Sequence, residues 1–232
     1  HGSRGIVTDH AAASFSPVLE RQHITVRKMG LSDYQVTWQA MKNFTDARSV
    51  QTCDEIWLLQ HPAVFTQGIA GKPGHLLHDN GIDLIKTDRG GQITYHGPGQ
   101  IVAYLLLDIR RLKLGVRELV RSMENAVIDL LKDYHIKAIS RFDAPGVYVD
   151  NAKIAALGLK IKKSYCYHGI ALNVDMDLTP FSYINPCGYQ GLQVTQTKDL
   201  GITDGLEILS NKLANQLQEK LLKGISIYHH DH

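Results

Sequence analysis

Apolar residues recur at helical spacing in two long segments of the chain. In residues 116–134 they fall three or four positions apart, which predicts an amphipathic helix. A second stripe, made of Leu206, Leu209, Leu213 and Leu217, predicts a helix that begins near Asp204. Ser32 is a suitable N-cap for a third helix, whose apolar side begins at Tyr34.

Extended segments lie ahead of these helices and between them. The clearest is QIVAYLLLDI at 100–109, which is so uniformly apolar that it predicts a strand in the middle of a sheet, covered on both faces. Shorter strand-like segments are HITVRKM at 23–29, DEIWLLQHP at 54–62, IDLIKT at 82–87, GVYV at 146–149, KIAALGLKI at 153–161 and YCYHGIALNV at 165–174. Because strands cluster instead of alternating strictly with helices, the pattern predicts an α+β (α/β layered) fold, a mixed β-sheet flanked by helices.

The same pattern bears on domain organisation. Residues 1–22 lack sustained periodicity, and we interpret them as a poorly structured extension or a remnant of cloning. No internal repeat, low-complexity tract or Pro/Ser-rich linker interrupts the rest of the sequence. Residues 23–228 are therefore predicted to form a single domain.

Charge and hydropathy narrow the class of protein. The formal charge of +2, from 25 basic and 23 acidic residues, gives no global field that would attract nucleic acid or anionic lipid. The longest apolar run, Ile101 to Leu107, is too short to span a bilayer. We expect a soluble, cytoplasmic protein that binds neither nucleic acid nor a membrane.

Three cysteines, an odd number without C-x-x-C spacing, argue against a disulfide framework and against a zinc site. Cys187 lies in INPCGYQG, between Pro186 and Gly188, where a tight turn would present a nucleophile and let backbone N–H groups approach a carbonyl oxygen. The alternative is an inert thiol packed beneath the turn, and the spacing alone favours that alternative.

The other two cysteines have weaker surroundings. Cys166 is predicted to share a strand face with His168, either as a core position or as half of a Cys–His pair. Cys53 stands beside Asp54, whose negative charge disfavours a thiolate. Neither is a good candidate for a nucleophile.

A cysteine nucleophile needs a base or a cation to form thiolate near neutral pH, and His96, His168 and Lys153 are candidates. Strand alternation puts Lys153 on the side of the apolar residues, whereas Lys160 and Lys162 fall on the other side. Such a lysine either extends from the end of the strand into solvent or is partly desolvated and able to exchange protons with a thiol.

A glycine-rich stretch, DRGGQITYHGPGQ at 88–100, supplies bare backbone in the middle of the chain. This backbone would suit a phosphate-binding loop, but the sequence has no G-x-G-x-x-G motif that opens a helix and no P-loop. The stretch is therefore not a standard nucleotide-binding loop.

Five segments together closely resemble the lipoyl(octanoyl) transferase family. They are RGGQITYHGPGQ at 89–100, APGVYV at 144–149, AKIAALGLKI at 152–161, HGIALNV at 168–174 and INPCGYQG at 184–191. The resemblance covers about residues 24–195 and is specific, because several long motifs occur in the right order. It implies the catalytic-domain fold of biotin and lipoate protein ligases.

The resemblance also implies an activity. Members of this family are acyltransferases that move an octanoyl group from octanoyl-acyl carrier protein to a lysine of a lipoyl domain, the first step of endogenous lipoate synthesis. The acceptors are lipoyl domains of 2-oxoacid dehydrogenase complexes and the glycine cleavage H protein. No ATP, metal or other cofactor is implied, since the donor itself carries phosphopantetheine.

Site residues follow from the resemblance motif by motif. The acyl-thioester cysteine of the family falls on Cys187 and its catalytic lysine on Lys153. Substrate-binding residues fall on Arg89, Gly90, Gly91, Gln92, Ile93, Thr94, Tyr95 and His96, on Ala156, Leu157 and Gly158, and on Gly169, Ile170 and Ala171. The glycine-rich stretch then becomes a wall of an acyl pocket, with Tyr95 and His96 on its rim.

Three other functions remain open on the sequence, one of which, a cysteine hydrolase, would need water admitted to the thioester, a feature that nothing in the sequence indicates. An ATP-dependent lipoate or biotin protein ligase would share the fold and a lysine near a glycine-rich loop, but would activate a free acid without a cysteine nucleophile. A non-catalytic module that binds lipoyl domains would tolerate loss of Cys187. Acidic partners lead us to expect a local basic rim, and its candidates are Arg110, Arg111, Lys113, Lys160, Lys162 and Lys163.

Overall fold

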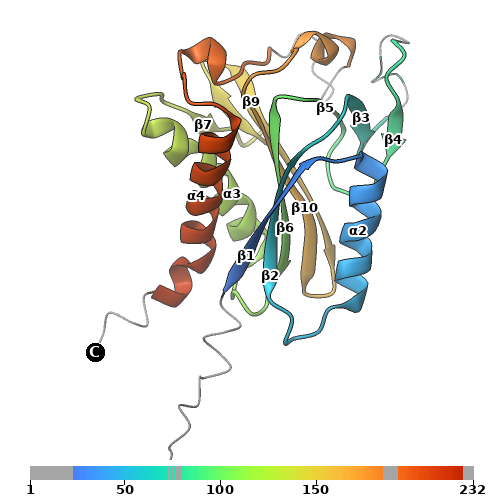
Figure 1. The fold of residues 1–232 in the computed structure, drawn as a ribbon, viewed down its shortest axis with the longest axis vertical. Helices are drawn as coiled ribbons and strands as arrows, with labels where there is room; N and C mark the ends of the chain where they lie inside the picture. Colours follow the sequence, from blue (N-terminus) through green and yellow to red (C-terminus); the bar gives the residue numbers. More distant parts are fainter. Residues whose placement is uncertain (1–22, 73, 75, 77–79, 185–192, 227–232) are drawn as a thin grey trace, which may run out of the picture.

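A computed structural model of the chain describes residues 23–72, 74, 76, 80–184 and 193–226. Its largest sheet contains β1 (Ile24–Leu31), β2 (Asp54–Gln60), β6 (Gln100–Asp108), β7 (Ile139–Ser140), β8 (Val147–Val149), β9 (Ala152–Lys162) and β10 (Tyr165–Asn173). The order across the sheet is β1-β2-β6-β10-β9-β8-β7 (Figure 1). β1 and β2 are parallel, and the other neighbours are antiparallel, so the sheet is mixed.

Helices cover both faces of this sheet. Figure 1 shows α2 (Tyr34–Ala47) on one side and α3 (Val116–Lys132) and α4 (Leu206–Ser226) together on the other. Two short 3₁₀ segments, η1 (Thr179–Tyr183) and η3 (Lys198–Leu200), follow β10. The predicted fold class, a mixed sheet flanked by helices, is confirmed. The predicted helices at 116–134 and from about residue 204 are confirmed as α3 and α4.

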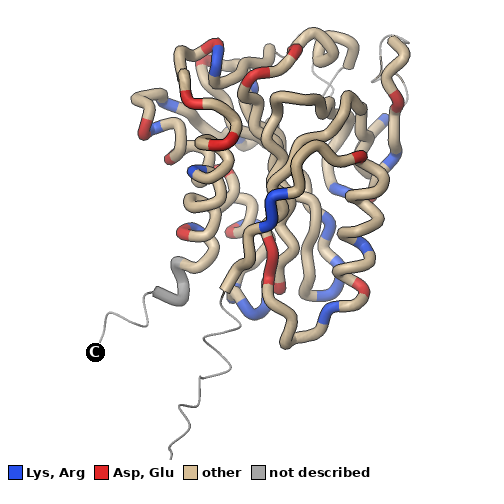
Figure 2. The backbone as a smooth tube through the Cα atoms, viewed as in Figure 1, with Lys and Arg blue, Asp and Glu red and all other residues tan. Residues whose placement is uncertain are grey.

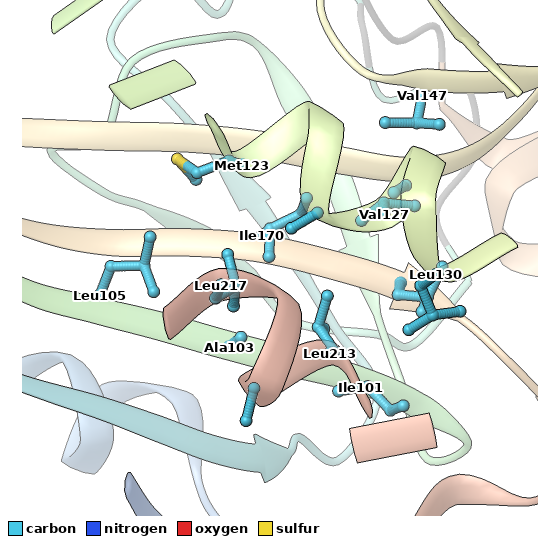
Figure 3. Close-up of a cluster of buried hydrophobic side chains, with 14 of the residues drawn as sticks. Ile101, Ala103, Leu105, Met123, Val127, Leu130, Val147, Ile170, Leu213 and Leu217 are labelled. Atoms are coloured by element: carbon cyan, nitrogen blue, oxygen red, sulfur yellow. The ribbon is translucent and has the colours of Figure 1, made fainter. Parts of the chain in front are cut away.

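Strand β6 lies third in the sheet and is buried along its whole length, as its apolar sequence predicts. Its side chains alternate between the two hydrophobic clusters that lie on opposite faces of the sheet. Ala103 and Leu105 pack toward α3 and α4, where Figure 3 shows them with Met123 and Leu217. Val102, Tyr104 and Leu106 pack toward α2 with Met41 and Trp57.

A second, three-stranded sheet was not expected from the sequence. It consists of β3 (Val64–Gln67), β4 (Leu84–Lys86) and β5 (Ile93–His96), in the order β4-β3-β5. Strand β5 comes from the glycine-rich stretch, and it pairs with β3 from Val64↔His96 to Gln67↔Ile93. The stretch is thus a strand with glycine turns on both sides.

The cap of α2 is Asp33, so the prediction of Ser32 is wrong by one residue. The Asp33 carboxylate accepts a hydrogen bond from the Val36 N–H at 3.0 Å. Ser32 directly follows β1, and its backbone N–H donates to the Gln60 carbonyl of β2 at 2.8 Å.

Two sequence predictions fall on residues outside the described ranges. These are the poorly structured extension at 1–22 and the catalytic cysteine, Cys187. Of the helices that the structure describes, none combines the length and the apolar character needed to cross a membrane. In the view of Figure 2, acidic and basic residues are interspersed over the helices and loops.

Candidate active site

A cavity of about 460 Å³ lies against β9 and β10. Its walls are the turn before β5, the middle of both strands and the first turns of α3. Every substrate-binding candidate of the resemblance except Tyr95 lines it, and so does Lys153. Segments that are far apart in the sequence therefore meet at one cavity.

Tyr95 packs on the other side of β5 from the cavity. Its ring lies 5.5 Å from that of Phe65 and 5.4 Å from that of Phe181, in a separate apolar cluster. His96, the next residue, does line the cavity but is buried inside it. The prediction that Tyr95 and His96 form an exposed rim is therefore wrong. Tyr95 points to the opposite face of β5 from His96, because adjacent strand residues alternate, and His96 lies in the buried part of the cavity.

Arg89 holds the glycine-rich turn in shape. Its guanidinium donates to the carbonyl of Gly90 at 2.9 Å, to that of Thr66 at 2.9 Å and to that of Gln92 at 2.8 Å. The residue is buried. Arg89 therefore acts here as a scaffold for the turn, with its positive charge directed at backbone carbonyls.

The turn attaches to β9 through a close backbone approach at Gly158. The Gly90 N–H donates to the Leu159 carbonyl at 2.8 Å, and a Cβ added to Gly158 would lie 2.8 Å from the Gly90 oxygen. Because real Cβ atoms do not approach an oxygen so closely, a larger residue at 158 would push the turn away from the strand. Glycine in AKIAALGLKI is thus required by the wall of the cavity.

Asp88 gathers hydrogen-bond donors from α2 and β10 at the side of the cavity. Its carboxylate accepts from Trp38 Nε1 at 2.9 Å, from His168 Nε2 at 2.7 Å and from the Tyr167 hydroxyl. Burial opposes ionisation, but the bonds from His168 and Tyr167 outweigh it and hold the pKa of Asp88 well below its ordinary value. The carboxylate stays charged. Its hydrogen bonds hold Asp88, and with it the glycine-rich turn that begins at Arg89, against α2 and β10.

His168 does not share a face with Cys166, so the expectation of a common face is wrong. The φ of His168 is +66°, a left-handed conformation in the middle of a strand, and its side chain bonds to Asp88 at the cavity. Cys166 instead lies in the core and donates to the Leu105 carbonyl at 3.4 Å. Burial raises the pKa of the Cys166 thiol to about 12, which removes it as a nucleophile.

Two further histidines near the cavity are buried and neutral. His61 Nδ1 donates to the Ser32 carbonyl at 2.7 Å, so Nε2 accepts from the Tyr104 hydroxyl at 2.6 Å. His96 Nδ1 lies 2.7 Å from Gln100 Oε1. Burial lowers the pKa of His61 to about 4, and burial together with the neighbouring His61 lowers that of His96 to about 3.

These two histidines predict a loss of stability in mild acid. Between pH 6.5 and about 4 the unfolded chain binds protons at His61 and His96 that the folded chain does not bind, so the unfolding free energy falls as the pH falls. Each histidine contributes about 1.4 kcal/mol per pH unit, or about 3 kcal/mol for both at pH 5.5. Urea unfolding at pH 7.5 and 5.5 measures the difference. His96→Gln should reduce it, His23→Gln should not, and an unfolding free energy that rises toward pH 5.5 would contradict the assignment.

Lys153 is fixed through its backbone and its side chain. Its N–H donates to the Gln193 carbonyl at 2.8 Å, and its carbonyl accepts from the Thr195 N–H at 2.9 Å. A Cβ added to Gly146, whose φ is +139°, would lie 2.7 Å from Lys153 Cε, so the lysine stem passes directly over this glycine. Gln193 follows Cys187 by six residues, so the chain that leaves the predicted nucleophile is anchored on the predicted catalytic lysine.

The six basic candidates lie at the other end of β9 from Lys153. Lys160 and Lys162 end β9, Lys163 follows it, and Arg110, Arg111 and Lys113 follow β6. Nine residues separate Lys153 from Lys162, which corresponds to about 30 Å along a strand. Arg111 is not available to a partner, because its guanidinium bonds to the buried Asp54 at 2.6 Å. In the part of the chain that the structure describes, no three His, Cys, Asp or Glu side chains gather as they would around a metal ion.

Comparison with known proteins agrees with this geometry. Residues 33–220 match the family described as the lipoyl protein ligase A/B catalytic domain. An octanoyltransferase of Nitrosomonas europaea is 65% identical over 198 residues, which cover 85% of this chain and 97% of the relative. The chain belongs to the octanoyltransferase family. A second member, from Nitrosospira multiformis, is 66% identical over 198 residues, 85% of this chain and 92% of the relative.

The fold of this octanoyltransferase is also similar to the solved structures of lipoate protein ligases. A putative lipoate protein ligase from T. acidophilum with bound lipoic acid superposes with a TM-score of 0.70 at 15% identity, over 85% of each chain. Lipoate-protein ligase A bound with ATP gives a TM-score of 0.67 at 15% identity, over 86% of this chain and 85% of the other. The fold of biotin and lipoate protein ligases that the sequence resemblance implied is confirmed.

Several residues at the cavity were not identified from the sequence. Tyr34 and Tyr104 line it on the side of α2, and Val116 and Val120 line it on the side of α3. Asp88 was missed although it directly precedes the Arg89 motif. Its position directly before the Arg89 motif could have identified Asp88 as a site residue. The lining side chains of α2 and α3, in contrast, look like ordinary apolar helix positions in the sequence.

Proposed function

We propose that the protein transfers an octanoyl group from octanoyl-acyl carrier protein to a lysine of a lipoyl domain, through a thioester on Cys187. The observation that carries this proposal is the convergence of Lys153 with the turn at 89–94, the middle of β9 and the middle of β10 on one cavity. High identity to octanoyltransferases supports the same acyl group and reaction. Lipoyl domains of 2-oxoacid dehydrogenase complexes and the glycine cleavage H protein are the proposed acceptors.

The first step forms the acyl-enzyme. The Cys187 thiolate attacks the thioester carbonyl, the C–S bond to the donor breaks, and the phosphopantetheine thiolate leaves and takes a proton from the Lys153 ammonium, so that Lys153 is a neutral amine for the second step. Backbone N–H groups of the glycine-rich turn stabilise the negative oxygen of the tetrahedral intermediate. The octanoyl chain packs among the apolar residues of the cavity, where each buried methylene contributes about 0.8 kcal/mol.

The second step forms the amide. The amine of the acceptor lysine attacks the Cys187 thioester, the C–S bond breaks, and Lys153 accepts the proton that the nitrogen loses. The anchoring of Lys153 through Gln193, Thr195 and Gly146 keeps its amine at a fixed place beside the cavity. A thioester is a more reactive acyl donor than an amide, so the proposed reaction uses neither ATP nor a metal, and the proposed location is the cytoplasm.

The ATP requirement separates this function from that of a ligase. Purified protein, octanoyl-acyl carrier protein and an unmodified lipoyl domain should give octanoylated lipoyl domain in the absence of ATP, detected as a mass increase of the acceptor. Free octanoate should give no product with or without ATP. Transfer that requires ATP and starts from free octanoate would establish a ligase instead, and binding of the acceptor without any transfer would establish a docking module.

A further inference from the structure

One edge of β9 is only partly covered by other backbone. Strand β8 pairs with β9 as far as Ala155, opposite Val147. Further along the same strand, the Leu159 carbonyl accepts the Gly90 N–H at 2.8 Å. Leu157 lies between these two contacts, and it lines the cavity.

The backbone groups of Leu157 point out of this edge. A Cβ added to Gly146, which precedes β8, would lie 2.8 Å from the Ala155 oxygen, so the carbonyls of Ala155 and Leu159 both face away from β10. Because alternate strand residues direct their N–H and C=O groups to the same side, those of Leu157 face this edge too. Within the described part of the chain, no backbone or side-chain group bonds to Leu157 on this side. A half-buried amide in a cavity requires a hydrogen-bond partner.

Apolar side chains flank this open amide. Val116 and Val120 of α3 and Pro145 line the cavity along the same edge, and Ile161 lies at its outer end. Val116 is 47% exposed, so this side of the groove is accessible to a ligand from solvent. We name this set, Leu157 with Val116, Val120, Pro145 and Ile161, the edge groove. The edge groove offers one backbone N–H and one backbone C=O, both of Leu157, between apolar side chains.

We propose that the edge groove binds the pantetheine arm of the acyl donor. A pantetheine arm is an extended chain with two secondary amides, short methylene segments and a pair of methyl groups. One of its amides can pair with the N–H and C=O of Leu157 as an added strand would, and its methyl and methylene groups match Val116 and Val120. The inference rests on the proposed function, since it concerns the donor of that reaction.

Charge at the two ends of the groove fits this orientation. Lys153 lines the cavity toward one end of β9, where the proposed chemistry takes place. At the other end Ile161 stands between Lys160 and Lys162 in the sequence, and Lys163 follows. The arm would enter from the basic end, which suits its phosphate and an acidic carrier protein. The basic residues predicted as a rim, apart from Arg111, would then lie where the carrier docks.

Two octanoyl donors and two matched variants test the inference. The donors are octanoyl-pantetheine and the octanoyl thioester of 2-mercaptoethanol, which has the same reacting bond and no amide. Val116→Asp puts a carboxylate into the groove, and it does so in the first turn of α3, where a negative charge stabilises the helix. Val36→Asp is the control, because Val36 is an exposed valine in the first turn of α2 and does not line the cavity.

We expect the wild-type protein to prefer octanoyl-pantetheine in kcat/KM by about tenfold or more. Val116→Asp should remove most of this preference by raising KM for octanoyl-pantetheine, and its kcat/KM for octanoyl-pantetheine should fall by several times more than its kcat/KM for the mercaptoethanol thioester. Val36→Asp should leave both values unchanged. Equal use of the two donors by the wild type, or an equal loss for both donors in Val116→Asp, would overturn the inference. Failure of the wild type with every thioester would instead overturn the proposed function.

Discussion

Replacing Cys187 with serine is expected to lower the rate of octanoyl transfer by about a thousandfold or more. A serine hydroxyl has no base in the proposed mechanism strong enough to ionise it, whereas a thiol near a lysine amine readily forms thiolate at neutral pH. The steady-state rate with octanoyl-acyl carrier protein and a lipoyl domain measures the effect.

Cys53→Ser is the matched control for Cys187→Ser. Cys53 does not line the cavity, so its substitution should leave the transfer rate within about twofold of the wild type. If Cys187→Ser kept most of the activity, the proposed thioester would be wrong, and direct transfer between donor and acceptor would have to be considered.

Replacing Lys153 with alanine is the second change with a large expected effect, a loss of about a hundredfold to ten-thousandfold in kcat. The variant lacks the group that accepts the proton of the acceptor amine. Lys153→Arg should lose a similar amount, because a guanidinium keeps its charge but cannot take up a proton at neutral pH. The steady-state rate of octanoyl transfer from octanoyl-acyl carrier protein to a lipoyl domain measures both losses.

Lys132→Ala, a change of an exposed lysine on α3 away from this cavity, serves as the control for Lys153→Ala. Gly146→Ala tests the same position indirectly. Its Cβ would lie 2.7 Å from Lys153 Cε and 2.8 Å from the Ala155 carbonyl oxygen, at a φ of +139°, so both kcat and the free energy of unfolding should fall while the lysine itself is retained. An active Lys153→Arg protein would mean that the residue supplies only a positive charge.

The fold followed from the sequence wherever a pattern was long and regular. The continuous apolar run of β6 predicted a buried central strand, and the stripe from Val116 to Leu131 predicted α3, because both elements are packed on the main core. The predicted strand at 82–87 contains β4, but the second sheet was missed, because β3 has only four residues and the sheet depends on pairing of β3 with β4 and β5 across the chain. The cap at Asp33 was missed, since Ser32 is an equally good cap by type and only backbone geometry distinguishes them.

The site was predictable only as far as its motifs reach. The resemblance found the turn at 89–94 and the strand segments at 156–158 and 169–171, which the structure brings together. The prediction from strand alternation that His168 shares a face with Cys166 was wrong, because a positive φ turns the His168 side chain toward Asp88. Nothing in the sequence YCYHGIALNV predicts that conformation. The edge groove could not be predicted from the sequence, because it depends on the residue at which β8 stops pairing with β9.

The measurement that tests the central claim most directly is the mass of the acyl-enzyme. The wild-type protein is incubated with octanoyl-acyl carrier protein in the absence of an acceptor, quenched in acid to preserve thioesters, digested and mapped by mass spectrometry. The proposed mechanism predicts one octanoyl group, on the peptide that contains Cys187, which disappears when a lipoyl domain is added. An active protein whose Cys187 carries no octanoyl group, or which carries that group on another residue, would contradict it.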